Sequence, residues 1–148
     1  ITVWLKGNRV SRNQIMAIKE ESVTEQKNSL AVCLDNILRH AGITRNTEYD
    51  LAQGKTAIEI LSENMTGVQV LELSGCSLDA VLYYVNQDIP VLAILENGEA
   101  VLVTGFNEFN VVIMEPSTGK LYKKGMNDAT TWFAENGNHF VTYMKMEN

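Results

Sequence analysis

The sequence is poor in several features that mark specialised classes of protein. Among 148 residues there are two cysteines, two prolines and two histidines, and aromatic residues make up 7%. No apolar stretch approaches the roughly 20 residues that a transmembrane helix needs, so this fragment is predicted to contain no membrane span. The net charge is −6 and the longest basic run is Lys123-Lys124. This charge balance argues against a nucleic-acid partner.

The two cysteines, Cys33 and Cys76, form no CxxC pair and have no metal-site spacing. Their number leaves a disulfide between them open, although a domain of this size does not need one. Cys33 lies within an apolar stripe with helical spacing, where a cysteine behaves as a small buried hydrophobe. The cysteines therefore predict no metal site, and no motif in the sequence predicts a cofactor.

The remaining composition, 45% apolar and 20% charged, is that of an ordinary globular domain. Residues 28–148 carry the clear patterns and are predicted to form that domain. Residues 1–27 are predicted to be an N-terminal extension, with an alternating pattern at Ile1–Val10 that suggests a short hairpin. The chain begins with isoleucine and has no signal-peptide pattern, and we expect it to be part of a longer polypeptide.

The most informative stretch is an antiparallel meander in the second half of the chain. Val91–Leu95 is apolar and too short for a helix, which favours a buried central strand. Asn97-Gly98 follows it and predicts a hairpin turn in which both residues take positive φ. The turn leads into a second strand at Ala100–Phe106, and a third strand is predicted at Asn110–Met114.

The strongest predicted helix precedes the meander. Leu30, Cys33, Leu34, Ile37, Leu38 and Ala41 repeat at helical spacing on one face, with Asn28 or Ser29 as the N-cap and Gly42 as the stop. Further helices are predicted at Lys55–Asn64, after a Ser77 cap, and from an Asn127-Asp128 cap to Glu135. Strands are predicted at Val68–Leu73, Lys120–Lys123 and His139–Lys145. Helices followed by clustered antiparallel strands indicate an α+β fold.

The order of these parts, together with two motifs, resembles a known family. The motifs are G-x-A-V-L-V-T-G-F from Gly98 and V-x-I-M-x-P-x-T-G from Val111. They resemble the double-glycine leader peptidases that process bacteriocins, which belong to the papain-like clan of cysteine peptidases. The resemblance runs from about Asn28 to Met144. It implies a papain-like fold in a bacterial protein, here a soluble domain of a membrane-anchored or secreted polypeptide, with helices packed on an antiparallel sheet.

The resemblance also implies positions for the catalytic groups, and the residues found there differ from the family pattern. The nucleophilic cysteine of a Cys-Gly-Pro run falls on Ser29, and the histidine of Gly-His-Ala-Val falls on Glu99. The aspartate of Asp-Pro falls on Glu115, next to Pro116. Gln26 is the candidate for the glutamine that helps to form the oxyanion hole. The pattern thus implies a degenerate catalytic triad.

A serine hydroxyl paired with a glutamate of pKa about 4.3 lacks the base that a thiol peptidase uses. Neither histidine supplies one: His40 suits the end of its helix, and His139 begins an edge-like strand. We therefore expect an inactive peptidase-like module that binds a peptide or partner protein, preferentially a basic one. The alternative is a hydrolase with altered chemistry that uses Ser29 or the Glu99 and Glu115 pair. Those two carboxylates could also share a hard cation such as Ca²⁺.

Overall fold

The computed structural model describes residues 14–15 and 28–146. The predicted hairpin at Ile1–Val10 and the candidate Gln26 lie outside this range. The helices are α2 (Ser29–His40), α3 (Thr47–Ala52), α4 (Ala57–Asn64), α5 (Leu78–Val85) and α6 (Met126–Glu135). The strands are β1 (Gln14–Ile15), β2 (Val68–Glu72), β3 (Val91–Ile94), β4 (Ala100–Phe106), β5 (Asn110–Glu115), β6 (Lys120–Gly125) and β7 (Phe140–Lys145).

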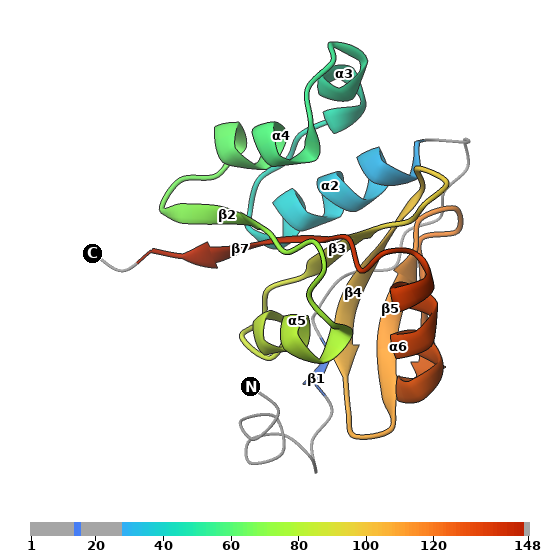
Figure 1. Cartoon of the computed structure of the whole chain (residues 1–148). Helices are drawn as coiled ribbons and strands as arrows, with labels where there is room; N and C mark the ends of the chain where they lie inside the picture. Colours follow the sequence, from blue (N-terminus) through green and yellow to red (C-terminus); the bar gives the residue numbers. More distant parts are fainter. Residues whose placement is uncertain (1–13, 16–27, 147–148) are drawn as a thin grey trace.

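In the described residues all strand pairs are antiparallel and seven strands form one sheet. Six of them are neighbours in the order β2-β7-β3-β4-β5-β6, and β1 pairs with β4. The last strand, β7, therefore lies between β2 and β3. Helices α2, α3 and α4 lie on one side of the sheet, and α5 and α6 lie on the other (Figure 1). Every residue of β4 is buried, as expected for a strand covered on both faces. The predicted α+β class is confirmed.

The hairpin that joins β3 to β4 is confirmed, but its turn is not the one predicted. Of the two turn residues only Gly98 has a positive φ, +87°. The Gly98 amide donates to the Leu95 carbonyl at 2.9 Å, and the Leu95 amide donates to the Glu99 carbonyl at 2.8 Å. The loop between Leu95 and Glu99 is therefore a turn that ends with Gly98 in the left-handed region. It is one residue longer than the predicted Asn97-Gly98 turn.

Helix α2 packs as its periodicity predicts. Asn28 is the N-cap, and its side chain accepts a hydrogen bond from the Leu30 amide at 2.9 Å. Leu34, Ile37 and Leu38 are fully buried, and α2 contacts β3 and β4. The helix stops at Gly42, which has a φ of +87° that other residues rarely adopt. The interior of the domain is thus organised around this helix and the central hairpin.

Two local features differ from the sequence prediction. Helix α3 is six residues long, too short to show a periodic pattern, and was not predicted. Helix α6 begins one residue before the predicted Asn127-Asp128 cap, with Gly125 as N-cap and no side-chain cap. Within residues 14–15 and 28–146, no helix has the length and apolar character needed to cross a bilayer.

The buried face of α2 gives a stability prediction. Leu34 is 0% exposed, whereas Met144 on β7 is 38% exposed. We expect Leu34→Ala to lower the free energy of unfolding by about 2–5 kcal/mol, because it removes buried methyl groups and leaves a cavity. Met144→Ala removes a side chain of similar size and should cost at most about 0.5 kcal/mol. Urea denaturation measures both values; equal costs would contradict the packing of α2 in the core.

Candidate functional site

Ser29 is the first residue of α2, directly after the Asn28 cap. The first turn of a helix has backbone amide groups without partners inside the helix, and the positive end of the helix dipole lies there. A thiolate at such a position is stabilised by both, which is why nucleophilic cysteines often occupy helix N-termini. Here the residue is a serine, whose hydroxyl is a much weaker acid and needs a general base to react.

The Ser29 hydroxyl oxygen accepts a hydrogen bond from the Ala100 amide at 2.9 Å. Because the Glu99 carbonyl bonds to β3, the Ala100 amide points away from β3. The pairing of β4 with β5 reaches only Leu102 opposite Met114, so among the described residues no strand partner bonds to the Ala100 amide. The hydroxyl fills that gap. It links the start of α2 to the start of β4, residues that are 71 positions apart in the chain.

The two carboxylates are occupied by residues close to them in sequence. Glu99 is exposed, and its side chain accepts from the Asn97 side-chain amide at 3.4 Å. Glu115, at the end of β5, accepts from the Ser117 amide at 3.1 Å and from the Ser117 hydroxyl at 3.0 Å. Within the described part of the chain, no hydrogen bond or ion pair joins these two carboxylates to each other or to Ser29.

We next consider whether residues 28–146 contain side chains that could bind a metal ion. Among them, no group of three or more His, Cys, Asp or Glu side chains comes together to hold an ion. Lys120 lies directly opposite Glu115 on β6 and brings a positive charge to the same end of the sheet. Nothing in this geometry favours a shared cation at the Glu99 and Glu115 positions.

Cys33 lies one helical turn after Ser29 and is fully buried. Burial raises the pKa of its thiol far above the usual range, and the negative charge of Glu115 raises it further. The group therefore stays a neutral thiol at physiological pH. Both cysteines are free, Cys33 in the core and Cys76 partly exposed, which settles the open question of a disulfide.

Both histidines of the chain lie away from Ser29. His40 is the last residue of α2, so its backbone lies roughly 16 Å from that of Ser29 along the helix. His139 precedes β7, and its carbonyl accepts from the Ile94 amide at 2.9 Å. Since Ile94 lies opposite Ala100, His139 is two strand spacings, roughly 10 Å, from Ala100. β7 is an interior strand, so the expectation of an edge-like strand at His139 was wrong.

Comparisons with known proteins identify the fold to which this arrangement belongs. No family model matches the chain, and no curated protein does. A crystal structure of a putative C39-like peptidase from Bacillus anthracis matches with a TM-score of 0.72 and 13% sequence identity. The match covers 90% of this chain and 98% of that one. The chain has the fold of a C39-like peptidase.

The C39-like fold confirms the papain-like architecture predicted from the sequence. At 13% identity the likeness concerns the fold, so the roles of individual residues follow from chemistry instead. Within that fold, Ser29 at the start of α2 lies beside the residue that follows Glu99. Glu115 ends the neighbouring strand β5. The fold thus brings two of the three candidate positions together, and neither carries the thiol or imidazole of a cysteine peptidase.

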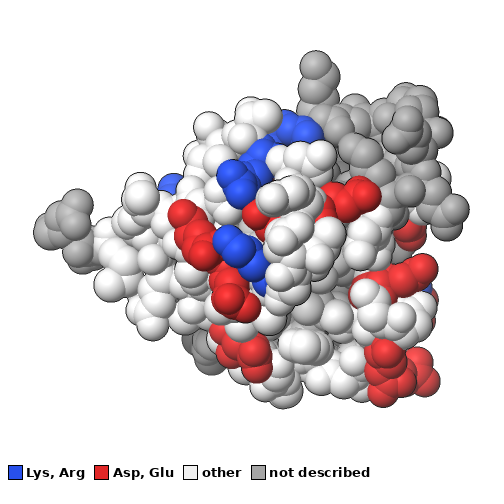
Figure 2. Space-filling model, turned by 90° about the horizontal axis from the view of Figure 1, so that it is seen from above, with Lys and Arg blue, Asp and Glu red and all other residues white. Residues whose placement is uncertain are grey.

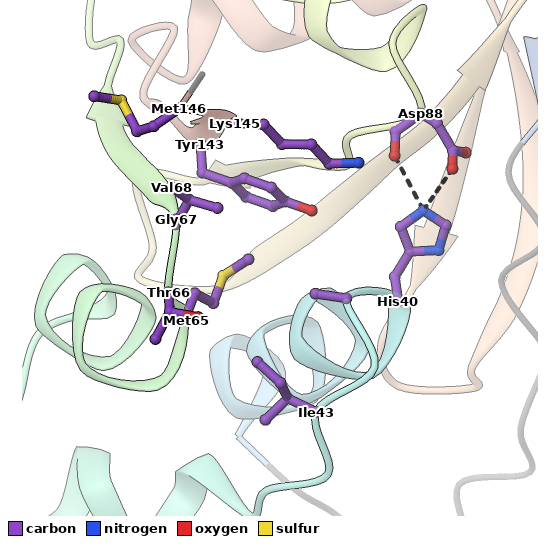
Figure 3. Close-up of a pocket in the computed structure, with 11 residues that line it drawn as sticks. His40, Ile43, Met65, Thr66, Gly67, Val68, Asp88, Tyr143, Lys145 and Met146 are labelled. Atoms are coloured by element: carbon purple, nitrogen blue, oxygen red, sulfur yellow. Dashed lines mark hydrogen bonds and ion pairs between the residues drawn. The ribbon is translucent and has the colours of Figure 1, made fainter. Parts of the chain in front are cut away.

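Sequence reasoning missed a pocket at the other end of α2. It has a volume of about 600 Å³ and includes His40, Asp88, Tyr143 and Lys145 in its lining (Figure 3). The His40 Nε2 atom lies 3.0 Å from the Asp88 carbonyl oxygen and 3.3 Å from its carboxylate. The sequence holds two weak indications of this pocket. Tyr143 and Lys145 alternate on one predicted strand, and Asp88 lies between a predicted helix and a predicted strand. Neither signal identifies a site before the chain folds.

The arrangement of Ser29 and Glu99 predicts that a reactive thiol can be restored. In a Cys76→Ser background, we expect Ser29→Cys/Glu99→His to react with iodoacetamide at pH 7 roughly tenfold faster than Ser29→Cys alone. A neighbouring imidazolium and the helix N-terminus both lower the pKa of a thiol. Mass spectrometry of the modified peptide over time measures the rate. Equal rates in the two variants would show that residue 99 does not reach residue 29.

Proposed function

We propose that this chain is a catalytically inactive C39-like peptidase domain that binds a peptide or a partner protein within a larger bacterial protein. The main support for a loss of catalysis is a hydrogen bond: the Ala100 amide donates to the Ser29 hydroxyl oxygen at 2.9 Å. The oxygen that would attack a substrate is used as a structural acceptor. The two histidines belong to other places in the fold: His40 ends α2, and His139 precedes β7, which β3 separates from β4.

The chemistry of the remaining groups supports this proposal. Peptide hydrolysis requires a base that removes the proton of the nucleophile and an acid that protonates the leaving amine. Glu99 is exposed and Glu115 is held by Ser117, and neither bonds to Ser29. A carboxylate is a poor base for a serine hydroxyl, and an ionised carboxylate has no proton to give to the leaving amine. This observation also weighs against a hydrolase that uses Ser29.

Binding of an extended peptide makes fewer demands than hydrolysis. Main-chain hydrogen bonds and side-chain pockets hold a peptide without any nucleophile. A fold that has lost its catalytic groups can therefore keep its recognition surface. We place that surface at the start of α2 and β4, around Ser29 and Ala100, where the candidate catalytic positions meet.

The charge of this region favours a basic ligand. Glu96 and Glu99 in the β3–β4 loop are exposed, and Glu115 lies nearby with Lys120 opposite it. The loop therefore carries acidic side chains. Over α3 and α4, by contrast, the basic groups are neutralised by acids: Arg45 pairs with Asp50 at 2.8 Å and Lys55 with Glu63 at 2.6 Å. Figure 2 shows acidic side chains in several separate groups over the face seen from above, in keeping with the net charge of −6.

The absence of catalysis is tested by incubating the purified domain with a double-glycine leader peptide and with thiol-directed peptidase inhibitors. We expect no cleavage, and no labelling of Cys33, because its thiol is buried and neutral. The Cys33→Ala variant is the control. Cleavage that inhibitors block and that this variant abolishes would overturn the proposal. Cleavage abolished by Ser29→Ala would favour the hydrolase with altered chemistry.

Peptide binding is tested by titrating a basic and an acidic peptide into ¹⁵N-labelled protein and following the amides of Ser29 and Ala100. We expect the basic peptide to shift them, and 0.5 M salt to weaken it because exposed charges are screened. The Glu99→Gln/Glu115→Gln variant should bind the basic peptide roughly 2- to 30-fold more weakly.

A matched control, Glu72→Gln/Glu108→Gln, removes the same charge at places away from the β3–β4 loop and should bind as the wild type does. If neither peptide shifts the amides around Ser29, or if both double variants bind equally well, this surface is not the recognition surface.

A further inference from the structure

The pocket at the C-terminal end of α2 has the size of a small-molecule site. Its volume of about 600 Å³ falls within the range of roughly 300–1,000 Å³ that ligand pockets occupy. It lies between the end of α2, the segment that leads into β2, and the end of β7 (Figure 3). The lining residues are His40, Ala41, Ile43, Met65, Thr66, Gly67, Val68, Asp88, Tyr143, Lys145 and Met146.

Two hydrogen-bond donors converge in this pocket from one strand. Tyr143 and Lys145 alternate on β7, so their side chains leave the same face of the sheet. Figure 3 shows both polar ends directed toward the space in front of the His40 and Asp88 pair. Among the residues that the structure describes, neither the Tyr143 hydroxyl nor the Lys145 ammonium has a hydrogen-bond or ion-pair partner. Most of Tyr143 is buried, with 3% of the residue exposed, while its hydroxyl is open to the pocket.

The opposite wall carries the contact between His40 and Asp88. The carbonyl and the carboxylate of Asp88 are both acceptors, so the His40 Nε2 atom carries a proton and donates to them. Asp88 has a φ of +66° in the turn that ends α5, where the Asp88 amide donates to the Val85 carbonyl and the Ile89 amide to the Tyr84 carbonyl, both at 3.0 Å. Burial, and to a lesser extent the charge of Asp88, raise the pKa of Tyr143. The hydroxyl therefore remains a donor at physiological pH.

The remaining lining is largely apolar. Ile43, Met65 and Val68 line the pocket on the α2 and β2 side, and Met146 completes it. The Met146 amide donates to the Gly67 carbonyl at 2.9 Å, which ties the two edges of the pocket together. The site thus combines two unpartnered donors, one of them cationic, with an apolar chamber.

We propose that this pocket binds a carboxylate carried on an apolar body. The carboxylate lies between the Lys145 ammonium and the Tyr143 hydroxyl, and the apolar body lies against Ile43, Met65 and Val68. Both donors are open to the pocket, so an accepting ligand can bond to them in place of water, and the positive charge of Lys145 attracts an anion. Two sources carry this chemistry: a free aliphatic acid, and the C-terminal residue of a peptide with an apolar side chain. β2, which begins at the pocket, is an edge strand of the sheet and could pair with such a peptide.

This site is separate from the recognition surface around Ser29. The two lie at opposite ends of α2, roughly 16 Å apart along the helix axis. Amide shifts at Ser29 and Ala100 report one site, and shifts at Gly67, Val68, Lys145 and Met146 report the other. Failure of either proposal therefore leaves the other intact.

The test uses four probes: sodium octanoate, octylammonium, and a tetrapeptide ending in leucine with either a free or an amidated C-terminus. Each probe is titrated into ¹⁵N-labelled protein to follow amide shifts, and calorimetry measures its affinity. We expect octanoate to shift the amides of Gly67, Val68, Lys145 and Met146, and octylammonium to leave them unchanged. Binding of the free-acid peptide but not its amide identifies a peptide C-terminus as the ligand. Binding of octanoate alone identifies a free acid. Both results support the carboxylate site.

Variants of the two donors test the assignment. Lys145→Met keeps the length of the side chain and removes its charge, and should weaken octanoate roughly tenfold or more. Tyr143→Phe removes only the hydroxyl and should weaken it roughly 3- to 10-fold. Lys120→Met, at the far edge of the sheet, is the matched control and should bind as the wild type does. Because Lys145 is exposed, its substitution tests the site even if Tyr143→Phe does not fold.

The proposal is overturned if neither octanoate nor the free-acid peptide shifts these amides. It is equally overturned if octylammonium binds as well as octanoate, or if Lys145→Met binds octanoate with unchanged affinity.

Discussion

The packing of α2 against β3 and β4 is the contact on which both ends of this molecule depend. The helix buries Leu34, Ile37 and Leu38 completely, and this burial fixes its position along the sheet. Since α2 is rigid, fixing its middle also fixes its two ends. One end brings Ser29 to the Ala100 amide, and the other brings His40 to Asp88. Apolar packing in the core thus sets the geometry of two polar sites that it does not touch.

The Ser29 hydroxyl has a structural role at the start of α2. It meets the start of β4 and accepts a hydrogen bond from the Ala100 amide, which has no strand partner among the described residues. An unsatisfied amide at that place would cost free energy, so the hydroxyl has a structural use that is independent of catalysis. Cys33 illustrates the reverse case. It carries the more nucleophilic atom, yet complete burial keeps it a neutral thiol.

The two sites differ in what their polar groups still lack. Around Ser29, the hydroxyl and both carboxylates have partners within the chain, and the charges nearest to them are mostly acidic. In the pocket at the other end of α2, Tyr143 and Lys145 are donors without acceptors among the described residues. The two ends of the same helix therefore differ in charge and in their unused hydrogen-bonding capacity, and this difference is why we propose different ligands for them.

Much of the fold follows from local patterns in the sequence. The Ser77 cap, the buried face of α2 and the glycine after Asn97 each act on residues within a few positions of themselves. The candidate positions Ser29, Glu99 and Glu115 came from the motif resemblance, and the structure places the first beside the neighbour of the second. Local patterns were insufficient for α3, since six residues leave no period to detect.

Tertiary structure alone decided the insertion of β7 between β2 and β3, the partner of the Ser29 hydroxyl and the existence of the pocket. The two side-chain contacts at the ends of α2 join residues 71 and 48 positions apart. Such contacts form only when the burial of whole apolar faces repays the entropy of closing long loops. Sequence periodicity indicates which face of a helix or strand is buried, but not which element packs against that face. The sequence therefore determined the elements and their apolar faces, and packing decided which polar groups came together.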